Sequence, residues 1–332
     1  MSGVQQTPPR PRILVARAVF PEVLAHLAQH FELESNEDDA VWSGPELAQR
    51  LADKDGALTT ATERIDAALL AACPRLRIVA NMAVGFNNFD LPALDAAGVW
   101  ATNTPDVLTE TTADFGFALL MATARRVTEA EHYLRAGHWK KWHYAQFAGA
   151  EVHGSRLGII GMGRIGQGIA RRAAHGFGMD VLYHNRSRLA PELEAACGAR
   201  YATKEELLQS ADHVVLVLPY TAESHHCIGA PELALMKPTA TLVNIARGGI
   251  VDDAALAAAL REGRIAAAGL DVFEGEPQVH PGLLAARNVV LTPHIASATV
   301  PTRRAMARLA ADNLIAFFAG RGPLTPVNAP RG

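Results

Sequence analysis

The chain has 332 residues, of which 49% are hydrophobic and 20% are charged, with a formal net charge of −3. This composition is that of a folded globular protein, and the length fits two domains better than one. A chain without basic excess is not expected to bind nucleic acid, and no uncharged run approaches the roughly 18 residues of a membrane span.

The N-terminus and the cysteines bear on location. Residues 1–12 are polar, contain three prolines and lack the apolar segment of a secretory leader, so we expect a loose tail. Cys73, Cys197 and Cys227 are widely spaced and odd in number, which predicts a reduced, cytoplasmic protein without a disulfide framework. His225 and His226 precede Cys227, but adjacent residues rarely converge on one ion, so no metal is expected.

Short apolar runs alternate with helical patterns in the first part of the chain. Strands are expected at residues 12–16, 55–59, 76–80 and 99–102, and helices at residues 21–31, 64–72 and 91–97. This alternation predicts one parallel-sheet domain. An apolar helical stretch follows at residues 107–126, and because it is too hydrophobic to face solvent we expect it to pack between two domains.

The most informative motif lies at residues 157–166, where an apolar strand runs into G-x-G-x-x-G and then into a helix. Gly161 permits the tight turn, Gly163 lets the backbone approach a pyrophosphate, and Gly166 lets helix and strand pack closely. The phosphates are then held at the helix N-terminus, and Arg164 and Ile165 complete the expected contacts of this turn. The alternative is a glycine-rich turn without a ligand.

The end of the next strand indicates which dinucleotide is bound. An NAD enzyme usually places Asp or Glu there, on the ribose 2′-hydroxyl. This chain has His184, Asn185, Arg186 and Ser187 instead. These residues include no carboxylate that would repel a 2′-phosphate. They do include a guanidinium, an amide and a hydroxyl group that can bind one. NADP(H) is therefore predicted to be preferred over NAD(H). The alternative is that Arg186 is a solvated loop residue.

Strands and helices continue to alternate after the glycine motif. Strands are expected at residues 180–183, 213–218, 241–245, 267–272 and 289–291, and helices at residues 204–209, 231–236 and 253–262. This order is typical of a doubly wound, Rossmann-type domain. A last helix, at residues 301–319, lies too far along the chain for that sheet and is expected to return to the first domain.

We therefore predict an α/β protein of two domains. A flavodoxin-like substrate domain, discontinuous in sequence, comprises residues 1–104 and 298–332, and a dinucleotide-binding domain comprises residues 105–297.

Polar side chains that follow the expected strands suggest the chemistry. Reduction of a carbonyl by a dihydronicotinamide needs a positive group at the carbonyl oxygen and a proton donor. Arg247 follows a strand, and its planar fork suits a 2-oxo acid. His294 follows the last strand, and histidine as a residue type can both give and take a proton, while Asp271, Glu274 and Glu276 supply carboxylates that can pair with it. Taken singly, each residue has a plainer explanation as a surface ion pair or a loop residue.

Four segments of the chain stand out together: G-I-I-G-M-G-R-I-G, N-I-A-R-G-G-I-V-D, G-L-D-V-F-E-G-E-P and T-P-H-I-A-S-A-T. They resemble the D-2-hydroxyacid dehydrogenase family, whose layout the chain follows from about residue 12 to residue 328. Within the family the chain looks most like glyoxylate/hydroxypyruvate reductases, some of which also reduce 2-ketogluconate. The resemblance implies that Arg247, Glu276 and His294 are catalytic, with His294 as the acid and Glu276, not Glu274, as its partner.

The resemblance also implies ligand contacts. Pro219, Ala246 and Asp271 are expected to contact the cofactor, with Asp271 on the nicotinamide carboxamide. The loop at residues 83–90 resembles one whose backbone N–H groups bind the substrate carboxylate. Val84 and Gly85 are the residues expected to do so, since glycine lets the backbone come close.

Two positions that differ from many relatives bear on the substrate pocket. Many relatives have Asp where Asn87 stands, and Ala296 replaces a glycine, which adds a methyl group near the histidine.

Residues 135–147 contain an aromatic cluster suited to an interface, and the family forms dimers through this region. In related reductases a tryptophan matching Trp142 reaches the neighbour's active site, so a homodimer is expected. The alternative is a local core cluster.

The resulting prediction is an enzyme that closes over NADPH and a short 2-oxo acid, glyoxylate or hydroxypyruvate, and reduces it to a 2-hydroxy acid. One alternative keeps the fold and changes the substrate to 2-ketogluconate, phosphoglycerate, formate or phosphite. Another is a non-catalytic, nucleotide-sensing binding protein.

Overall fold

The computed structural model describes residues 10–330, which fold into two compact units. Of the described residues, the first unit contains 10–108 and 299–330, and the second unit is Thr109–Ala298. Of the expected N-terminal tail, residues 1–9 lie outside the described residues. Within residues 10–330 no helix is both long and apolar enough to cross a membrane.

The first unit is a five-stranded parallel sheet in the order β2-β1-β3-β4-β5. The strands are β1 (Arg12–Val15), β2 (Glu32–Ser35), β3 (Gly56–Thr59), β4 (Ile78–Asn81) and β5 (Trp100–Thr102). This is the strand order of flavodoxin-like sheets.

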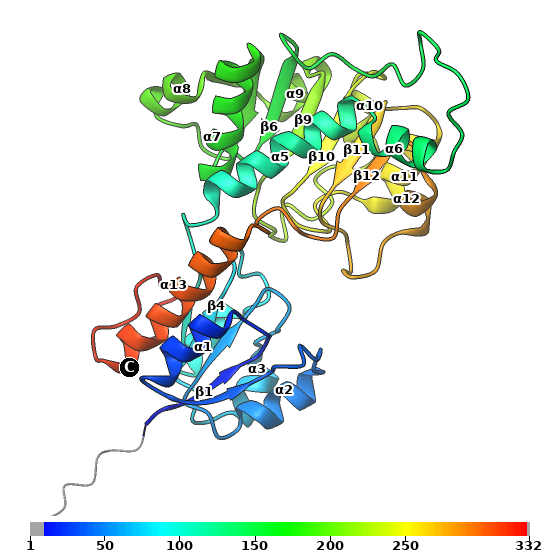
Figure 1. The fold of residues 1–332 in the computed structure, drawn as a ribbon. Coiled ribbons are helices and arrows are strands. Elements are labelled where there is room, and N and C mark those ends of the chain that lie inside the picture. Colours follow the sequence, from blue (N-terminus) through cyan, green and yellow to red (C-terminus); the bar gives the residue numbers. More distant parts are fainter. Residues whose placement is uncertain (1–9, 331–332) are drawn as a thin grey trace, which may run out of the picture. The chain divides into compact units, whose positions relative to one another are not determined.

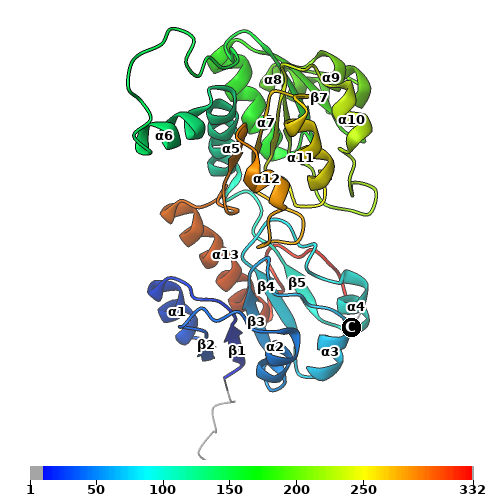
Figure 2. The same ribbon diagram turned by 90° about the vertical axis from the view of Figure 1, so that its right-hand side faces the viewer.

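Helices cover both faces of this sheet, as Figure 2 shows. One face packs on α1 (Pro21–Ala28) and α13 (Val300–Phe318), and the other on α2 (Gly44–Leu51), α3 (Ala67–Ala72) and α4 (Leu91–Ala96). The last helix thus packs on the first sheet. This return was expected because the helix lies too far along the chain to belong to the second sheet.

The second unit is a seven-stranded parallel sheet in the order β12-β11-β10-β9-β6-β7-β8 (Figure 1). Its strands are β6 (Arg156–Ile160), β7 (Asp180–His184), β8 (Ala199–Tyr201), β9 (His213–Leu216), β10 (Thr241–Asn244), β11 (Ala267–Leu270) and β12 (Val289–Leu291). The order reverses between β6 and β9, the switch point at which doubly wound sheets bind ligands. The expected α/β class with two doubly wound sheets is confirmed.

Two layers of helices enclose the second sheet. One layer contains α5 (Thr109–Ala124), α7 (Arg164–Arg171), the π-helical turn η1 (Arg172–Gly176) and α8 (Pro191–Cys197). The other contains α9 (Lys204–Ser210), α10 (Ala230–Leu235), α11 (Asp253–Arg261) and α12 (Pro281–Ala285). A sheet buried on both faces explains why its strands are continuous apolar runs.

Helix α5 belongs to the second unit, where it packs on α7, β10 and β11. A Cβ atom at Gly116 would lie 2.7 Å from Ile245 and 3.0 Å from Ile169, so this glycine lets the helix approach the sheet closely. The apolar character that suggested a position between domains is accounted for by this contact. A short helix, α6 (Val127–Arg135), follows α5.

Candidate active site

The expected site residues of the second unit follow strands of one parallel sheet. Gly161 comes directly after β6 and Asn185 directly after β7, while Asp271 comes directly after β11. Pro219, Arg247 and His294 each come three residues after a strand, namely β9, β10 and β12. Because all seven strands are parallel, these residues gather at the carboxyl edge of the sheet.

The glycine turn has the shape that a dinucleotide phosphate requires. Gly161 has φ +101°, and a Cβ there would lie 2.6 Å from the carbonyl of Val217. A Cβ at Gly166 would lie 2.4 Å from the carbonyl oxygen of Gly161. At Gly163, the N-cap of α7, an added Cβ would meet nothing within 4 Å. The first and third glycines therefore serve packing, and the second leaves open space at a helix N-terminus that suits an anion.

Residues 185–187 divide into an inward and an outward part. Asn185 accepts a hydrogen bond from the backbone N–H of Met162 at 2.7 Å, so its side chain fastens the glycine turn. Arg186 and Ser187 are exposed. Arg188 is also exposed, but its guanidinium donates two hydrogen bonds to Glu194, at 2.8 and 2.9 Å. Arg186 is therefore the better candidate at this strand end for contact with a ligand.

Glu223 lies near Arg186. The pKa of Glu223 is below its ordinary value, chiefly because the Thr221 hydroxyl bonds to it and, to a smaller extent, because of the positive charge of Arg186. An acidic neighbour within electrostatic range of Arg186 opposes the binding of a second anion there.

Arg247 is held at the end of β10 by Asn244. The Asn244 side chain accepts from the N–H of Ala246 at 3.0 Å and donates to the carbonyl of Arg247 at 3.2 Å. The guanidinium donates to the carbonyl of Ala246 at 2.7 Å. Burial lowers the pKa of Arg247, partly offset by the negative charge of Glu276. Arginine stays protonated in proteins, so a half-buried cation stands within electrostatic reach of Glu276.

His294 and Glu276 form a hydrogen-bonded pair. Nδ1 of His294 lies 2.8 Å from Oε2 of Glu276, and the N–H of Phe273 donates to Oε1 at 2.9 Å. Burial acts to raise the pKa of Glu276, but the bonds from His294 and Phe273 and the charge of Arg247 bring it below the ordinary value. An ionised Glu276 fixes the proton on Nδ1 and leaves Nε2 as the nitrogen for proton transfer.

Asp271 holds the loop that carries His294. Its carboxylate is fully buried and accepts from the Thr292 hydroxyl at 2.7 Å and from the N–H groups of Ile295 and Ala296 at 2.8 and 2.9 Å. The N–H of His294 donates to the Asp271 carbonyl at 2.9 Å, and His294 has φ +53°. The structure therefore shows Asp271 supporting His294, and its contact with the cofactor stays a prediction.

Glu274 points to a different histidine. It lies 2.8 Å from Nε2 of His226, and the ligating atoms of His225, His226 and Glu274 are within 4.8 Å of one another. The two imidazoles stack at 3.9 Å with an angle of 21° between their planes. Since imidazole binds a metal in its own plane, nearly parallel rings do not point at one centre.

The substrate loop expected in the first unit follows β4. Val84 and Gly85 are half-buried, and Asn87 is exposed. This places the loop at the carboxyl edge of the first sheet, with backbone close to the surface.

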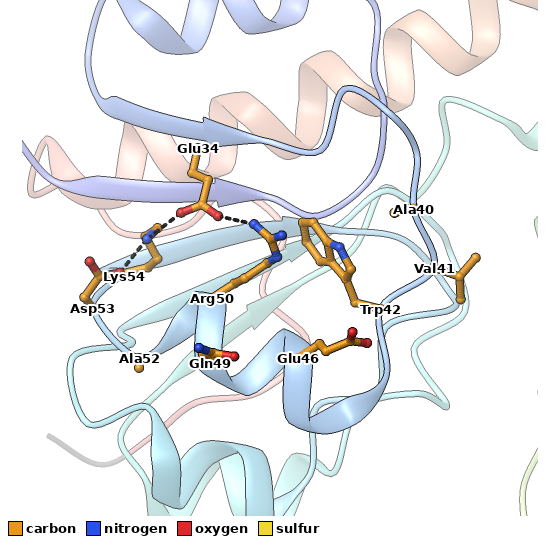
Figure 3. Close-up of a pocket in the computed structure, with 10 residues that line it drawn as sticks. All are labelled: Glu34, Ala40, Val41, Trp42, Glu46, Gln49, Arg50, Ala52, Asp53 and Lys54. Carbon is orange, nitrogen blue, oxygen red and sulfur yellow. Dashed lines mark hydrogen bonds and ion pairs between the residues drawn. The ribbon is translucent and has the colours of Figure 1, made fainter.

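A surface hollow of about 720 Å³ in the first unit is lined by none of the expected site residues (Figure 3). Its charges satisfy one another, because Glu34 accepts from Arg50 and from Lys54, each at 2.8 Å. The Arg50 guanidinium also lies 4.3 Å from the centre of the Trp42 ring. We interpret the hollow as part of the sheet's charged edge.

The aromatic residues after α6 are not part of a core. Trp139, Trp142 and Tyr144 have exposed fractions of 53%, 70% and 92%. They lie in a long irregular segment that projects from the second unit in both Figure 1 and Figure 2. Exposed aromatic side chains in such numbers favour an interface over a local cluster.

The fold and the carboxyl-edge residues together define a nucleotide-dependent oxidoreductase with a histidine–carboxylate pair. Comparison with known proteins is more specific: residues 117–296 match the D-isomer specific 2-hydroxyacid dehydrogenase, NAD binding domain. The chain belongs to this family, as its four motifs predicted, and is an enzyme of that class.

Full-length relatives support the assignment. A glyoxylate reductase from Thermococcus onnurineus is 51% identical over 323 residues, which cover 96% of each chain. A solved NADPH-dependent glyoxylate/hydroxypyruvate reductase from Sinorhizobium meliloti, in complex with NADP and malonate, is 39% identical with a TM-score of 0.84, covering 96% of this chain and 97% of that one. A 2-hydroxyacid dehydrogenase from Polaromonas, named as NAD-binding, is 37% identical with a TM-score of 0.89, covering 96% and 100%.

Sequence reasoning did not single out the residues that support the site. The loops that carry the expected residues are held by hydrogen bonds of four polar side chains, namely those of Asn81, Asn103, Asn244 and Thr292. Their common signal is a polar side chain at or just after the end of a buried strand, where the alternation of apolar residues stops.

Proposed function

We propose that this enzyme reduces short 2-oxo acids, with glyoxylate and hydroxypyruvate as the first candidates, and that it uses NADPH in preference to NADH. The names of the Thermococcus and Sinorhizobium relatives support the substrate class. The observation that carries the reaction type is the His294–Glu276 pair, 2.8 Å apart, within electrostatic reach of Arg247.

The turn at Gly161–Gly166 suits the pyrophosphate of a dinucleotide, since only the middle glycine leaves open space. When bound, the reduced nicotinamide supplies a hydride for the substrate's keto carbon. Arg247 binds the 2-oxo acid and draws electron density to the keto oxygen. Nε2 of protonated His294 gives its proton to that oxygen, which becomes the product hydroxyl. Glu276 stabilises the imidazolium before transfer and holds the ring in place, and solvent restores the proton afterwards.

Further roles are proposed for residues outside this trio. We propose that Arg186 and Ser187, which are exposed just after β7, contact a 2′-phosphate, and that Pro219, Ala246 and Asp271 contact the rest of the cofactor. The N–H groups of the loop at Val84 and Gly85 would take the substrate carboxylate. We further propose a homodimer in which the exposed segment around Trp142 forms the interface.

The test is a pair of matched histidine variants. His294→Ala should lower kcat for glyoxylate by roughly 10²–10⁴-fold, because the general acid is lost. His226→Ala is the control, since His226 also pairs with a glutamate at 2.8 Å but is given no part in the reaction. NADPH affinity should be unchanged in both. Near-normal turnover of His294→Ala would refute the assignment.

A substrate panel decides among the related activities. NADPH oxidation is followed with glyoxylate, hydroxypyruvate, 2-ketogluconate and phosphoglycerate, and with Arg247→Lys beside the natural protein. Loss of the planar fork should reduce kcat/KM for the preferred 2-oxo acid by roughly 10²-fold. If no 2-oxo acid is reduced, the proposed function fails.

A further inference from the structure

The turn after β4 is held by hydrogen bonds to three consecutive carbonyl groups. The carbonyl of Ala83 accepts from the N–H of Thr104 at 2.9 Å. The carbonyl of Val84 accepts from the side-chain amide of Asn103 at 2.8 Å, and that of Gly85 from the side-chain amide of Asn81 at 3.0 Å. All the donors come from the ends of two adjacent strands, β4 and β5.

These bonds determine where the N–H groups of the turn point. In a planar trans peptide the carbonyl and the following N–H point in opposite directions. Fixing the carbonyls of Ala83, Val84 and Gly85 therefore turns the next three amides away from the donors. Within residues 10–330 no hydrogen bond uses the N–H groups of Val84, Gly85 or Phe86. Successive backbone N–H groups in a turn that lack an internal acceptor offer hydrogen-bond donors to an anion.

Asn81 shows that the arrangement has a cost. Its side chain is fully buried, and its Oδ1 atom has no partner among the described residues. A buried polar atom without a partner is unfavourable, and a small apolar residue at this position would avoid it. The bond from Nδ2 to Gly85 is the contribution of Asn81 that an apolar residue cannot make.

We propose that Asn103 and Asn81 are positioning residues for the substrate carboxylate. By fixing the carbonyls of Val84 and Gly85, they aim the backbone N–H groups of this turn at the carboxylate of a 2-oxo acid. Asparagine suits the task because its amide donates without adding charge, whereas aspartate in the same place would repel the carbonyl. This inference rests on the proposed function, since that function supplies the anion.

The experiment measures binding apart from turnover. Oxalate, a dicarboxylate that is not reduced, is titrated by calorimetry into the NADPH-saturated protein. Asn103→Ala should weaken oxalate binding at least tenfold with NADPH affinity unchanged, and KM for glyoxylate should rise more than kcat falls. Asn81→Ala should show the same pattern. Asn103 is half-buried, so its variant is expected to fold even if the fully buried Asn81 does not tolerate alanine.

Asn36→Ala is the matched control. Asn36 is a buried asparagine of the same unit whose amide donates to the carbonyls of Ala16 and Ala40, at 2.9 and 2.8 Å. It should leave oxalate binding unaltered. Unchanged oxalate affinity in folded Asn103→Ala, or equal weakening in Asn36→Ala, overturns the proposal. If the unsubstituted protein binds oxalate but reduces no 2-oxo acid, the proposed function is refuted. The effect of the two asparagines on carboxylate binding is still measured by the oxalate titration.

Discussion

Nδ1 of His294 lies 2.8 Å from Oε2 of Glu276, and the same carboxylate accepts the N–H of Phe273 through its other oxygen. Both oxygens of Glu276 are thus occupied, and the imidazole is fixed from one side only. This leaves the other ring nitrogen for the proposed proton transfer and links the orientation of the imidazole to the charge of a single carboxylate.

Replacing Glu276 with Gln should lower kcat by roughly 10²-fold, because a neutral amide stabilises an imidazolium far less than a carboxylate does. The pH above which reduction slows should also move down, since the protonated histidine loses its counter-charge. A pH profile of kcat/KM measures both effects. Glu274→Gln, which alters the other histidine–glutamate pair, should leave the profile in place; a profile unmoved in both variants would contradict the role of Glu276.

Arg186→Ala should reduce the preference for NADPH over NADH by roughly tenfold, because a charge-assisted bond to the 2′-phosphate is lost. Glu223→Gln should act in the opposite sense, since it removes the negative charge that faces Arg186. Ratios of kcat/KM for the two cofactors give the measurement. An unaltered ratio in Arg186→Ala would contradict the role of Arg186 and would mean that other residues determine the cofactor preference.

His213 should make the protein sensitive to acid. It is fully buried, its ring nitrogens lie 2.8 Å from the Thr241 hydroxyl and 3.1 Å from the Glu151 carbonyl, and burial holds its pKa below the ordinary value of 6.5. The unfolded chain therefore takes up a proton before the folded protein does. The free energy of unfolding should fall as the pH drops below about 6.5 and level off below the lowered pKa.

Urea unfolding at several pH values measures this loss. His213→Gln should show a shallower dependence on pH than the natural protein, although it is less stable at neutral pH. His175→Gln, at an exposed histidine of the same unit, should keep the natural slope. A slope unaffected by His213→Gln would mean that other groups cause the acid sensitivity.

Trp142→Ala should weaken self-association at least tenfold if the projecting segment forms the interface, because exposed tryptophans are frequent anchors of such contacts. Light scattering over a dilution series gives the mass of the particle. Trp42→Ala, in the first unit, is the control and should not change it. A natural protein that stays monomeric at all concentrations would contradict the proposed dimer.

Most of the fold could be predicted, because its strands are apolar runs separated by helical patterns. The strand expected at residues 55–59 is β3, and the helix expected at residues 301–319 is α13, with ends shifted by one residue. β2 was missed because its sequence, ELES, is largely polar at the sheet edge. α2 was missed although Ser43 and Glu46 form a capping box, a signal that is visible in the sequence.

The site could be predicted only in part. Arg247 and His294 could be proposed because polar side chains stand out just after strands. The pairing of His294 with Glu276 rather than Glu274, which the structure shows, was implied only by the family resemblance. The support of His294 by Asp271, and of Val84 by Asn103, depends on how loops fold back over the sheet, which no spacing in the sequence specifies. The same holds for the approach of Glu274 to His226, residues separated by 48 positions.

Asn81 and Asn244 are each the last residue of a strand, Asp271 directly follows one, and all three grip the loop that comes next. Rigidity of the apolar sheets is thereby passed to short stretches of backbone at the surface. In such a scaffold the residues that position the reacting groups are different from the residues that select the substrate. The stretches beyond the gripping side chains can be exchanged to admit longer or bulkier acids, while the groups that perform the reduction stay in register.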